Sequence, residues 1–226
     1  YLSVAEALSH SGYEFGAFVD IKWIDSEKIT EENVKETLEG VSGVIVPGGF
    51  GNRGIEGMII TANYCRTNNL PYLGICLGMQ IAVISFARYV CNIPDANSRE
   101  FSENGLHNVI DFLPDQTDKT DKGGTLRLGA YPCSVKEDTM MYKCYKAKDI
   151  SERHRHRYEF NNEYRELLEK AGLTISGTSP DDYIVETVEI KENDFYVGVQ
   201  FHPEFKSRPN KPHPLFLGLI EAALNK

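Results

Sequence analysis

The sequence predicts an α/β protein, a three-layer sandwich in which helices cover both faces of a mostly parallel central sheet. Three observations support this class. Short apolar runs alternate with amphipathic stretches along the first ninety residues. The runs over 44–46 and 72–75 are apolar throughout, which is typical of strands buried on both faces. Finally, 226 residues with 41% hydrophobic content can fill one sizeable core, so residues 1–226 are expected to form a single domain.

The elements of the first half follow from the period of their apolar residues and from the turn residues between them. Parallel sheets of this kind bind ligands beyond the carboxyl ends of their strands, so the turns after Val46 and Ile75 are the first places to search for a site. In order, we predict a helix over 1–12, a strand over 17–23, a helix over 30–38, a strand over 44–46, a helix over 55–66, a strand over 72–75 and a helix over 77–90.

The regular alternation of predicted strands and helices ends after Val90. The segment 114–124 is rich in Asp, Thr, Lys and Gly, which predicts a mobile loop. An antiparallel hairpin is expected to follow later in the chain, with its turn at 192–194. The elements predicted for this half are a strand over 126–135, a helix over 161–171, the hairpin strands over 184–191 and 195–200, and a closing helix over 215–224.

Composition excludes several classes of function. The net charge of −9 argues against a broad cationic surface for nucleic acid or for an anionic membrane. Five cysteines, an odd number without C-x-x-C spacing, predict neither a disulfide framework nor a zinc site, and fit reduced thiols in the cytoplasm. The sequence contains no signal-peptide pattern and no apolar run long enough to span a bilayer. We therefore expect a soluble, cytoplasmic protein that binds no metal.

Cys76 is the candidate nucleophile. It stands between Gly74 and Gly78, where an apolar strand pattern gives way to a helical one. Glycines two residues before and after a nucleophile suit a tight strand-to-helix turn, and a thiolate at a helix N-terminus is stabilised by free backbone N–H groups. A buried cysteine between two packing glycines is the alternative, and this window alone does not decide between the two.

The glycine-rich run 47–54 follows another predicted strand and contains Gly49-x-Gly51-x-x-Gly54. This spacing matches a dinucleotide fingerprint, which also needs an acidic residue at the end of the next strand. The next strand ends at Cys76 instead, so the dinucleotide interpretation is disfavoured. A backbone amide of this turn, such as that of Gly49, could complete an oxyanion hole with the amide of Leu77.

His202 is the strongest candidate for the base that a cysteine nucleophile needs. It follows a buried-strand pattern over 195–201, and Glu204 lies two residues further on. In extended backbone these two side chains point the same way, so Glu204 can orient the far ring nitrogen of His202. A surface turn with an incidental histidine and glutamate is the alternative, but the presence of Cys76 in the same chain favours the catalytic interpretation.

Residues 151–160 form the densest charge cluster of the chain, and its simplest interpretation is a solvated face. Metal binding by His154 and His156 is disfavoured because the flanking arginines repel a cation. An arginine here could clamp a substrate carboxylate. A fixed carboxylate at Glu100 would suit a substrate ammonium group.

Together these motifs resemble the class I glutamine amidotransferases. The resemblance covers nearly the whole chain and implies that L-glutamine is the substrate. By this resemblance, Cys76, His202 and Glu204 match the catalytic triad. The remaining assignments that it implies are an oxyanion hole from the amides of Gly49 and Leu77, and contacts to the glutamine from Phe50, Gln80, Glu100 and Arg157.

The resemblance also implies partners. It is sharpest to members in which a synthetase domain precedes this one, binds ATP and Mg and uses the ammonia to aminate UTP. In those members GTP activates glutamine hydrolysis by binding between the two domains, and residues 114–127 resemble the lid loop involved. The full-length enzyme is a homotetramer. We expect the synthetase domain and the first strand of the fold to be missing here, and no cofactor in this domain. The alternatives are another γ-glutamyl hydrolase or amidotransferase built on the same triad, or a catalytically silent regulatory or assembly module.

Overall fold

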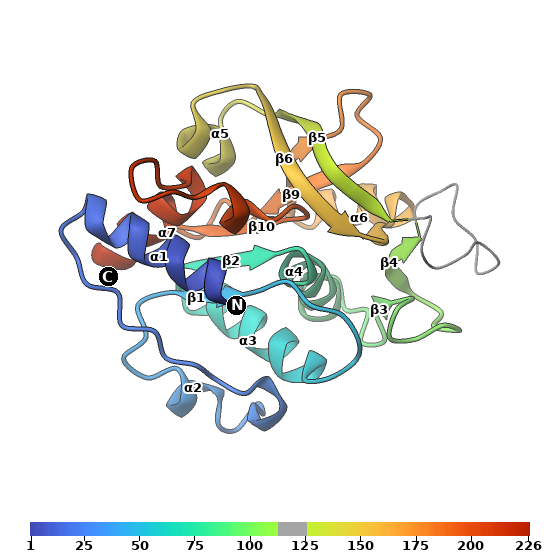
Figure 1. Cartoon of the computed structure of the whole chain (residues 1–226). Coiled ribbons are helices and arrows are strands. Elements are labelled where there is room, and N and C mark those ends of the chain that lie inside the picture. Colours follow the sequence, from blue (N-terminus) through green and yellow to red (C-terminus); the bar gives the residue numbers. More distant parts are fainter. Residues whose placement is uncertain (113–125) are drawn as a thin grey trace.

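The computed structural model describes residues 1–112 and 126–226. A seven-stranded sheet with the order β1-β2-β10-β9-β8-β5-β6 lies at its centre, and helices cover both faces (Figure 1). This arrangement confirms the predicted α/β class. The strands of this sheet are β1 (Val44–Val46), β2 (Tyr72–Ile75), β5 (Arg127–Val135), β6 (Asp149–His156), β8 (Thr174–Thr178), β9 (Val185–Glu189) and β10 (Tyr196–Val199). The helices are α1 (Leu2–Glu14), α2 (Val34–Thr37), α3 (Ile55–Thr67), α4 (Leu77–Tyr89), α5 (Met140–Tyr145), α6 (Arg165–Lys170) and α7 (Pro214–Leu224).

The sheet has two parts of different character. Strands β1, β2 and β10 are parallel to one another, and we call them, with the turns that follow them, the parallel half. Val46 and Gly198 both lie opposite Gly74, so the three strands end at the same edge of the sheet. The turns after these strands therefore meet in space.

The other four strands, β9, β8, β5 and β6, pair in antiparallel fashion, and we call them the antiparallel half. β9 and β10 form the predicted hairpin, with Gly198 opposite Val188. The parallel arrangement expected from the first ninety residues is thus confined to three strands, and the sheet as a whole is mixed. Between β9 and β10 the cause is local, because a short turn between consecutive strands permits only antiparallel pairing.

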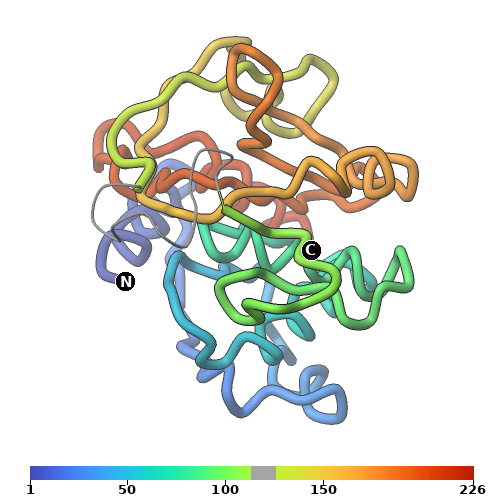
Figure 2. Tube along the Cα trace, turned by 90° about the vertical axis from the view of Figure 1, so that its right-hand side faces the viewer, coloured from blue at the N-terminus to red at the C-terminus, as the bar shows by residue number. Residues whose placement is uncertain are grey.

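A second, three-stranded sheet consists of β3 (Asn97–Ser98), β4 (Asn108–Phe112) and β7 (Tyr158–Phe160). β4 and β7 pair in antiparallel fashion, so segments far apart in the sequence lie side by side (Figure 2). β7 follows β6 after one residue. This small sheet therefore joins the antiparallel half to the segment after α4. The predicted lid falls largely on residues 113–125, which lie outside the described residues.

The alternation of buried side chains shows how the layers are built. Tyr72 and Tyr196 belong to the core on one face of the sheet, together with residues of α3 and α4. Leu73 and Val197 point to the opposite core, which also contains residues of α1 and α7. Successive residues of a strand face opposite sides of a sheet, so these two cores give the predicted three layers. No helix within 1–112 or 126–226 is long and apolar enough to cross a membrane.

Two predictions from the first forty residues are wrong. The strand predicted over 17–23 is absent from the structure. Two of its apolar side chains are exposed, Phe18 by 93% and Trp23 by 65%, and the others are half-buried. The helix predicted over 30–38 is reduced to α2. The side chains of Thr30 and Asn33 accept hydrogen bonds from each other's backbone N–H groups, at 3.3 and 2.8 Å, and this reciprocal pair caps the turn that leads into the short helix.

Candidate active site

Cys76 lies between β2 and α4, at the N-cap position of the helix, with φ 51° and ψ −102°. A positive φ is uncommon for a residue with a side chain and costs of order 1–3 kcal/mol. The Cys76 amide donates to the Val199 carbonyl at 2.7 Å, which ties the turn to β10. The thiol is thereby held at the start of a helix that buries nearly all of its length. The strand-to-helix turn predicted from the glycine spacing is present.

The two glycines beside Cys76 are required by close backbone packing. A Cβ atom on Gly78 would lie 2.0 Å from the Val46 carbonyl oxygen. One on Gly74 would lie 2.5 Å from the Gly78 carbonyl. Backbone atoms cannot move aside as a flexible side chain can, so only glycine fits at these positions. The same close approach brings the turn after β1 against the turn after β2.

His202 and Glu204 follow β10 and approach the site from the third parallel strand. The His202 Nδ1 and the Glu204 Oε1 lie 2.8 Å apart. The predicted extended backbone is replaced by a 3-10 turn over Pro203–Lys206, which begins directly after His202. The pair forms nonetheless, and the His202 amide donates to the Arg153 carbonyl at 2.8 Å, which fixes its position against β6.

The surroundings of His202 favour its protonated form. Burial alone lowers the pKa of this imidazole, but hydrogen bonds to Cys76 and Glu204 outweigh burial and raise the pKa to about 10. A protonated His202 beside Cys76 favours the thiolate form of the sulfur, as in other cysteine and histidine pairs. The site can therefore hold an ion pair of thiolate and imidazolium.

The glycine-rich turn after β1 packs against both catalytic candidates. A Cβ on Gly48 would lie 2.7 Å from the His202 Cε1 and 3.5 Å from the Cys76 Cβ. A Cβ on Gly49 would lie 3.4 Å from the Leu77 side chain. Among the described residues, none accepts a hydrogen bond from the amides of Gly49 or Leu77. These two amides are thus free to bind an oxyanion.

The four residues expected to contact glutamine differ from one another in burial and in hydrogen bonding. Gln80 is buried one turn into α4 and donates from Nε2 to the Tyr158 carbonyl at 3.1 Å. Glu100 accepts from the Gly51 amide at 2.9 Å and so holds the glycine-rich turn. Burial raises the pKa of Glu100, and this hydrogen bond opposes the rise.

Phe50 and Arg157 are the two remaining members of that set. The Phe50 side chain is 83% exposed and does not enclose Cys76 in this structure. Arg157 follows β6, and its guanidinium lies 5.2 Å from the centre of the Phe112 ring. Tyr158, next in the chain, stacks on Phe112 with ring centres 5.0 Å apart. Arg157 therefore borders the small sheet that lies beside α4.

The charge cluster over 151–160 is solvated on one side only. Burial alternates along β6, where Glu152, His154 and His156 are buried and the arginines between them are exposed. The interpretation as a solvated face is therefore wrong for every second residue. The period of two was visible in the sequence, but a buried face made of Glu and His is rare enough to be overlooked.

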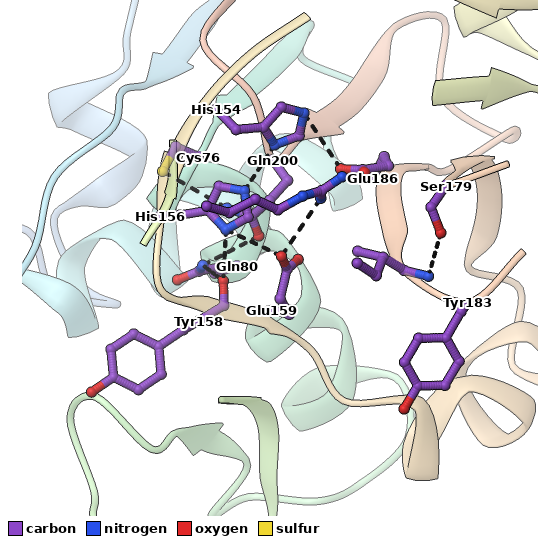
Figure 3. A network of polar contacts seen from close by, with 12 residues as sticks. Cys76, Gln80, His154, His156, Tyr158, Glu159, Ser179, Tyr183, Glu186 and Gln200 are labelled. Atoms are coloured by element: carbon purple, nitrogen blue, oxygen red, sulfur yellow. Dashed lines mark hydrogen bonds and ion pairs between the residues drawn. The ribbon is translucent and has the colours of Figure 1, made fainter. Parts of the chain in front are cut away.

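His154 and His156, two of the buried residues of β6, belong to a polar network that includes Cys76 (Figure 3). The His154 Nδ1 and the His156 Nε2 are 2.8 Å apart. Burial, followed by the repulsion of His156 and Arg127, lowers the pKa of His154 to about 2. Burial and Arg127 lower the pKa of His156 to about 3. Both rings are therefore neutral at physiological pH.

Arg127 is the buried cation of this network, and two glutamates face it. Its guanidinium lies 2.5 Å from the Glu186 carboxylate and 3.6 Å from that of Glu159. Burial raises the pKa of both carboxyl groups, and Glu186 raises that of Glu159 further. No spacing in the sequence indicates this cluster, because its members come from β5, β7 and β9. Within 1–112 and 126–226, no three or more His, Cys, Asp or Glu side chains form a group that could hold a metal ion.

Comparison with known proteins agrees with this geometry. The family model for "Glutamine amidotransferase class-I" matches residues 1–222, and the chain belongs to this family. Its relatives include the CTP synthases of Staphylococcus saprophyticus, 58% identical, and Caldanaerobacter subterraneus, 56% identical, each over 225 residues. The match covers 100% of this chain but 42% of each relative.

Solved structures extend the comparison to the fold. The glutaminase domain of Trypanosoma brucei CTPS, with bound acivicin, superimposes with a TM-score of 0.94 at 39% identity, covering 100% of this chain and 88% of that one. A GMP synthase-like protein from Thermoplasma acidophilum shares the fold alone, with a TM-score of 0.61 at 17% identity, covering 98% of this chain and 86% of that one. The chain is thus a glutamine amidotransferase domain of the CTP synthase type.

Proposed function

We propose that this domain hydrolyses L-glutamine to glutamate and ammonia through a thioester on Cys76. The observation that carries the proposal is the meeting of three strand ends. Cys76 is held at positive φ at the start of α4, and His202, bound to Glu204 at 2.8 Å, faces it from the turn after β10. A nucleophile, a base and an orienting carboxylate in this order are what covalent catalysis of amide hydrolysis needs.

The reaction has two halves that share one intermediate. The Cys76 thiolate attacks the γ-carboxamide carbon, and the amides of Gly49 and Leu77 hold the oxyanion, each such donor contributing about 3 kcal/mol. His202 gives its proton to the departing nitrogen, so ammonia leaves and a γ-glutamyl thioester remains. Neutral His202 then takes a proton from water, hydroxide attacks the thioester, and glutamate and the thiolate are released.

The remaining site residues are proposed to hold the substrate. Glu100 and the Gln80 carbonyl oxygen suit the α-ammonium group, and Arg157 suits the α-carboxylate. Phe50, exposed in this structure, is positioned on the glycine-rich turn and would close over bound glutamine. These roles explain why polar residues surround a buried thiol.

We propose further that the ammonia is used by a partner domain. The chain spans 42% of the length of the CTP synthases that it resembles. In the whole protein, a synthetase domain would precede this one, bind ATP, Mg and UTP, and aminate UTP to CTP. GTP would activate glutamine hydrolysis by binding at the interface of the two domains. The whole enzyme would be a homotetramer and would act in the cytoplasm. This domain itself would need no cofactor.

A glutaminase assay with two cysteine variants tests the proposal. The domain is expected to release glutamate from glutamine, and Cys76→Ala should lose this activity by at least about 10³-fold, because no other group can form the thioester. Cys91→Ala, which removes a partly exposed thiol away from the site, is the matched control and should keep it. Equal activity of Cys76→Ala and the wild type would exclude the proposal.

A further inference from the structure

The sulfur of Cys76 has a second neighbour that the triad does not include. Gln200, the residue after β10, is completely buried, and its side-chain nitrogen Nε2 lies 3.7 Å from the Cys76 sulfur (Figure 3). An N–H group at this distance from sulfur can donate a hydrogen bond to it. The backbone amide of Gln200 donates to the Glu186 carbonyl at 2.8 Å, which anchors Gln200 to β9.

The orientation of the Gln200 amide follows from a chain of hydrogen bonds. At the far end, the Tyr158 carbonyl oxygen can only accept, so the Gln80 group that faces it must be the NH₂ group, at 3.1 Å. The same Gln80 nitrogen lies 3.2 Å from the Gln200 side chain, which must therefore present its oxygen. The Gln200 NH₂ group is then left facing Cys76. One backbone carbonyl thus fixes the direction of both amides.

Other groups around the sulfur act in different directions. The Arg155 carbonyl on β6 lies 3.9 Å from the sulfur and can accept from the neutral thiol, so it favours the protonated form. Protonated His202 favours the thiolate, as does the start of α4. His154 and His156, on the same strand as Arg155, have pKa values lowered to about 2 and 3, so both are neutral and add no charge. The Gln200 donor therefore opposes the effect of the Arg155 carbonyl.

From this geometry we infer that Gln200 is a positioning residue that donates a hydrogen bond to the Cys76 thiolate and aligns Gln80 through its carbonyl oxygen. The inference rests on the proposed function of Cys76 as the nucleophile. It gives the single Gln200 side chain two separable roles. Its nitrogen acts on the reactivity of Cys76, and its oxygen acts on the position of Gln80.

Two variants separate these roles. Gln200→Glu keeps an oxygen for the Gln80 donor but has no N–H for the sulfur, and Gln200→Met removes both. The readouts are the pH dependence of alkylation of Cys76 by iodoacetamide, located by peptide mass spectrometry, together with kcat and KM for glutamine. Ser176→Ala is the control, because Ser176 is fully buried and bonds to Thr187 at 2.8 Å, away from Cys76.

In Gln200→Met, alkylation of Cys76 at pH 7 should slow about tenfold, with the midpoint of the pH profile about one unit higher, because a hydrogen bond to a charged group is lost. In Gln200→Glu the midpoint should rise further, because the negative charge of the new carboxylate beside the sulfur also opposes the thiolate. KM should rise in Gln200→Met and stay within about twofold of wild type in Gln200→Glu. Ser176→Ala should leave the profile unchanged. Profiles of the two Gln200 variants that coincide with wild type would overturn the inference.

A measurement on the unmodified protein covers the case in which neither variant folds. The side-chain NH₂ resonances of Gln200 in ¹⁵N-labelled protein should shift with the same pH midpoint as the alkylation rate. Gln200 NH₂ resonances whose chemical shifts do not change at this pH midpoint would also overturn the inference. Alkylation and these resonances need no glutamine, so loss of the inference is distinguishable from loss of the proposed glutaminase function.

Discussion

The parallel and the antiparallel half place their polar residues in opposite ways. In the parallel half, Cys76 and His202 stand just beyond the ends of apolar strands, in turns whose backbone geometry positions them. In the antiparallel half, Arg127, Glu186 and His154 lie within the strands and are buried between the layers. Changes in the parallel half should therefore reduce activity more than stability, and changes in the antiparallel half should do the reverse.

The largest effect is expected at His202. His202→Ala should lower glutamine turnover by about 10³-fold, since general acid and base catalysis contributes about 10²–10⁴-fold. Its free energy of unfolding should change little by comparison when it is measured above pH 10, where the His202 imidazolium no longer contributes to stability. Turnover and urea denaturation measured side by side test this, with His107→Ala as the control, because His107 is half-exposed and pairs with Asp95 at 2.9 Å. If His202→Ala kept the wild-type turnover, the proposed difference between the parallel and the antiparallel half would be contradicted.

Arg127 offers the opposite case. Arg127→Met removes one partner of a buried ion pair and should cost about 3 kcal/mol of stability, since the two glutamates remain without their cation. Urea denaturation measures this cost. Arg53→Met removes a solvent-exposed pair with Glu27 at 2.9 Å and should cost far less stability, because solvent screens an exposed pair. Equal losses in the free energy of unfolding for Arg127→Met and Arg53→Met would contradict the claim that burial makes the Arg127 ion pair important for stability.

A smaller effect on activity is expected from Gly48. A Cβ here would meet the His202 ring at 2.7 Å, and the ring can turn aside without unfolding the protein. Gly48→Ala should therefore lower kcat about tenfold, because misplacing a catalytic group costs rate rather than stability. Gly43→Ala, whose Cβ would meet only ordinary contacts from 3.5 Å, is the matched control. A drop in stability without loss of kcat would argue against this role.

The smallest effect concerns pH. The pKa of His202 is raised from its ordinary value to about 10, so its contribution to stability is fully present below about pH 6.5 and is lost as pH rises through 10. The free energy of unfolding of the wild type should fall by about 1 kcal/mol more between pH 7 and 10 than that of Cys76→Ala, where one partner of His202 is gone. Chemical denaturation across this range measures it, and parallel curves would show that Cys76 does not stabilise the imidazolium.

The sequence predicted the parallel half well because its signals are local. The bounds of β2 and the start of α4 agree with prediction, since glycines around Cys76 and an apolar run mark them directly. The pairing of Glu204 with His202 was predicted for the same reason, although their backbone forms a 3-10 turn instead of an extended strand.

The antiparallel half was predicted less completely, because its polar network depends on contacts between distant segments. Arg127 meets Glu159 and Glu186 only after three strands have come together, and no local pattern reveals such a meeting. The strand expected over 17–23 failed for a related reason. Alternation of apolar residues permits a strand, but pairing with a neighbour decides whether one forms.

The most direct test of the proposed role of Cys76 is the labelling of the cysteines by a chloromethyl ketone analogue of glutamine, located by mass spectrometry. We expect rapid labelling of Cys76 that excess glutamine slows, and much slower labelling in His202→Ala. Cys91 and Cys144, the two partly exposed thiols, should react only slowly. Labelling of Cys91 or Cys144 at the rate of Cys76, or labelling of Cys76 that does not depend on His202, would contradict this role.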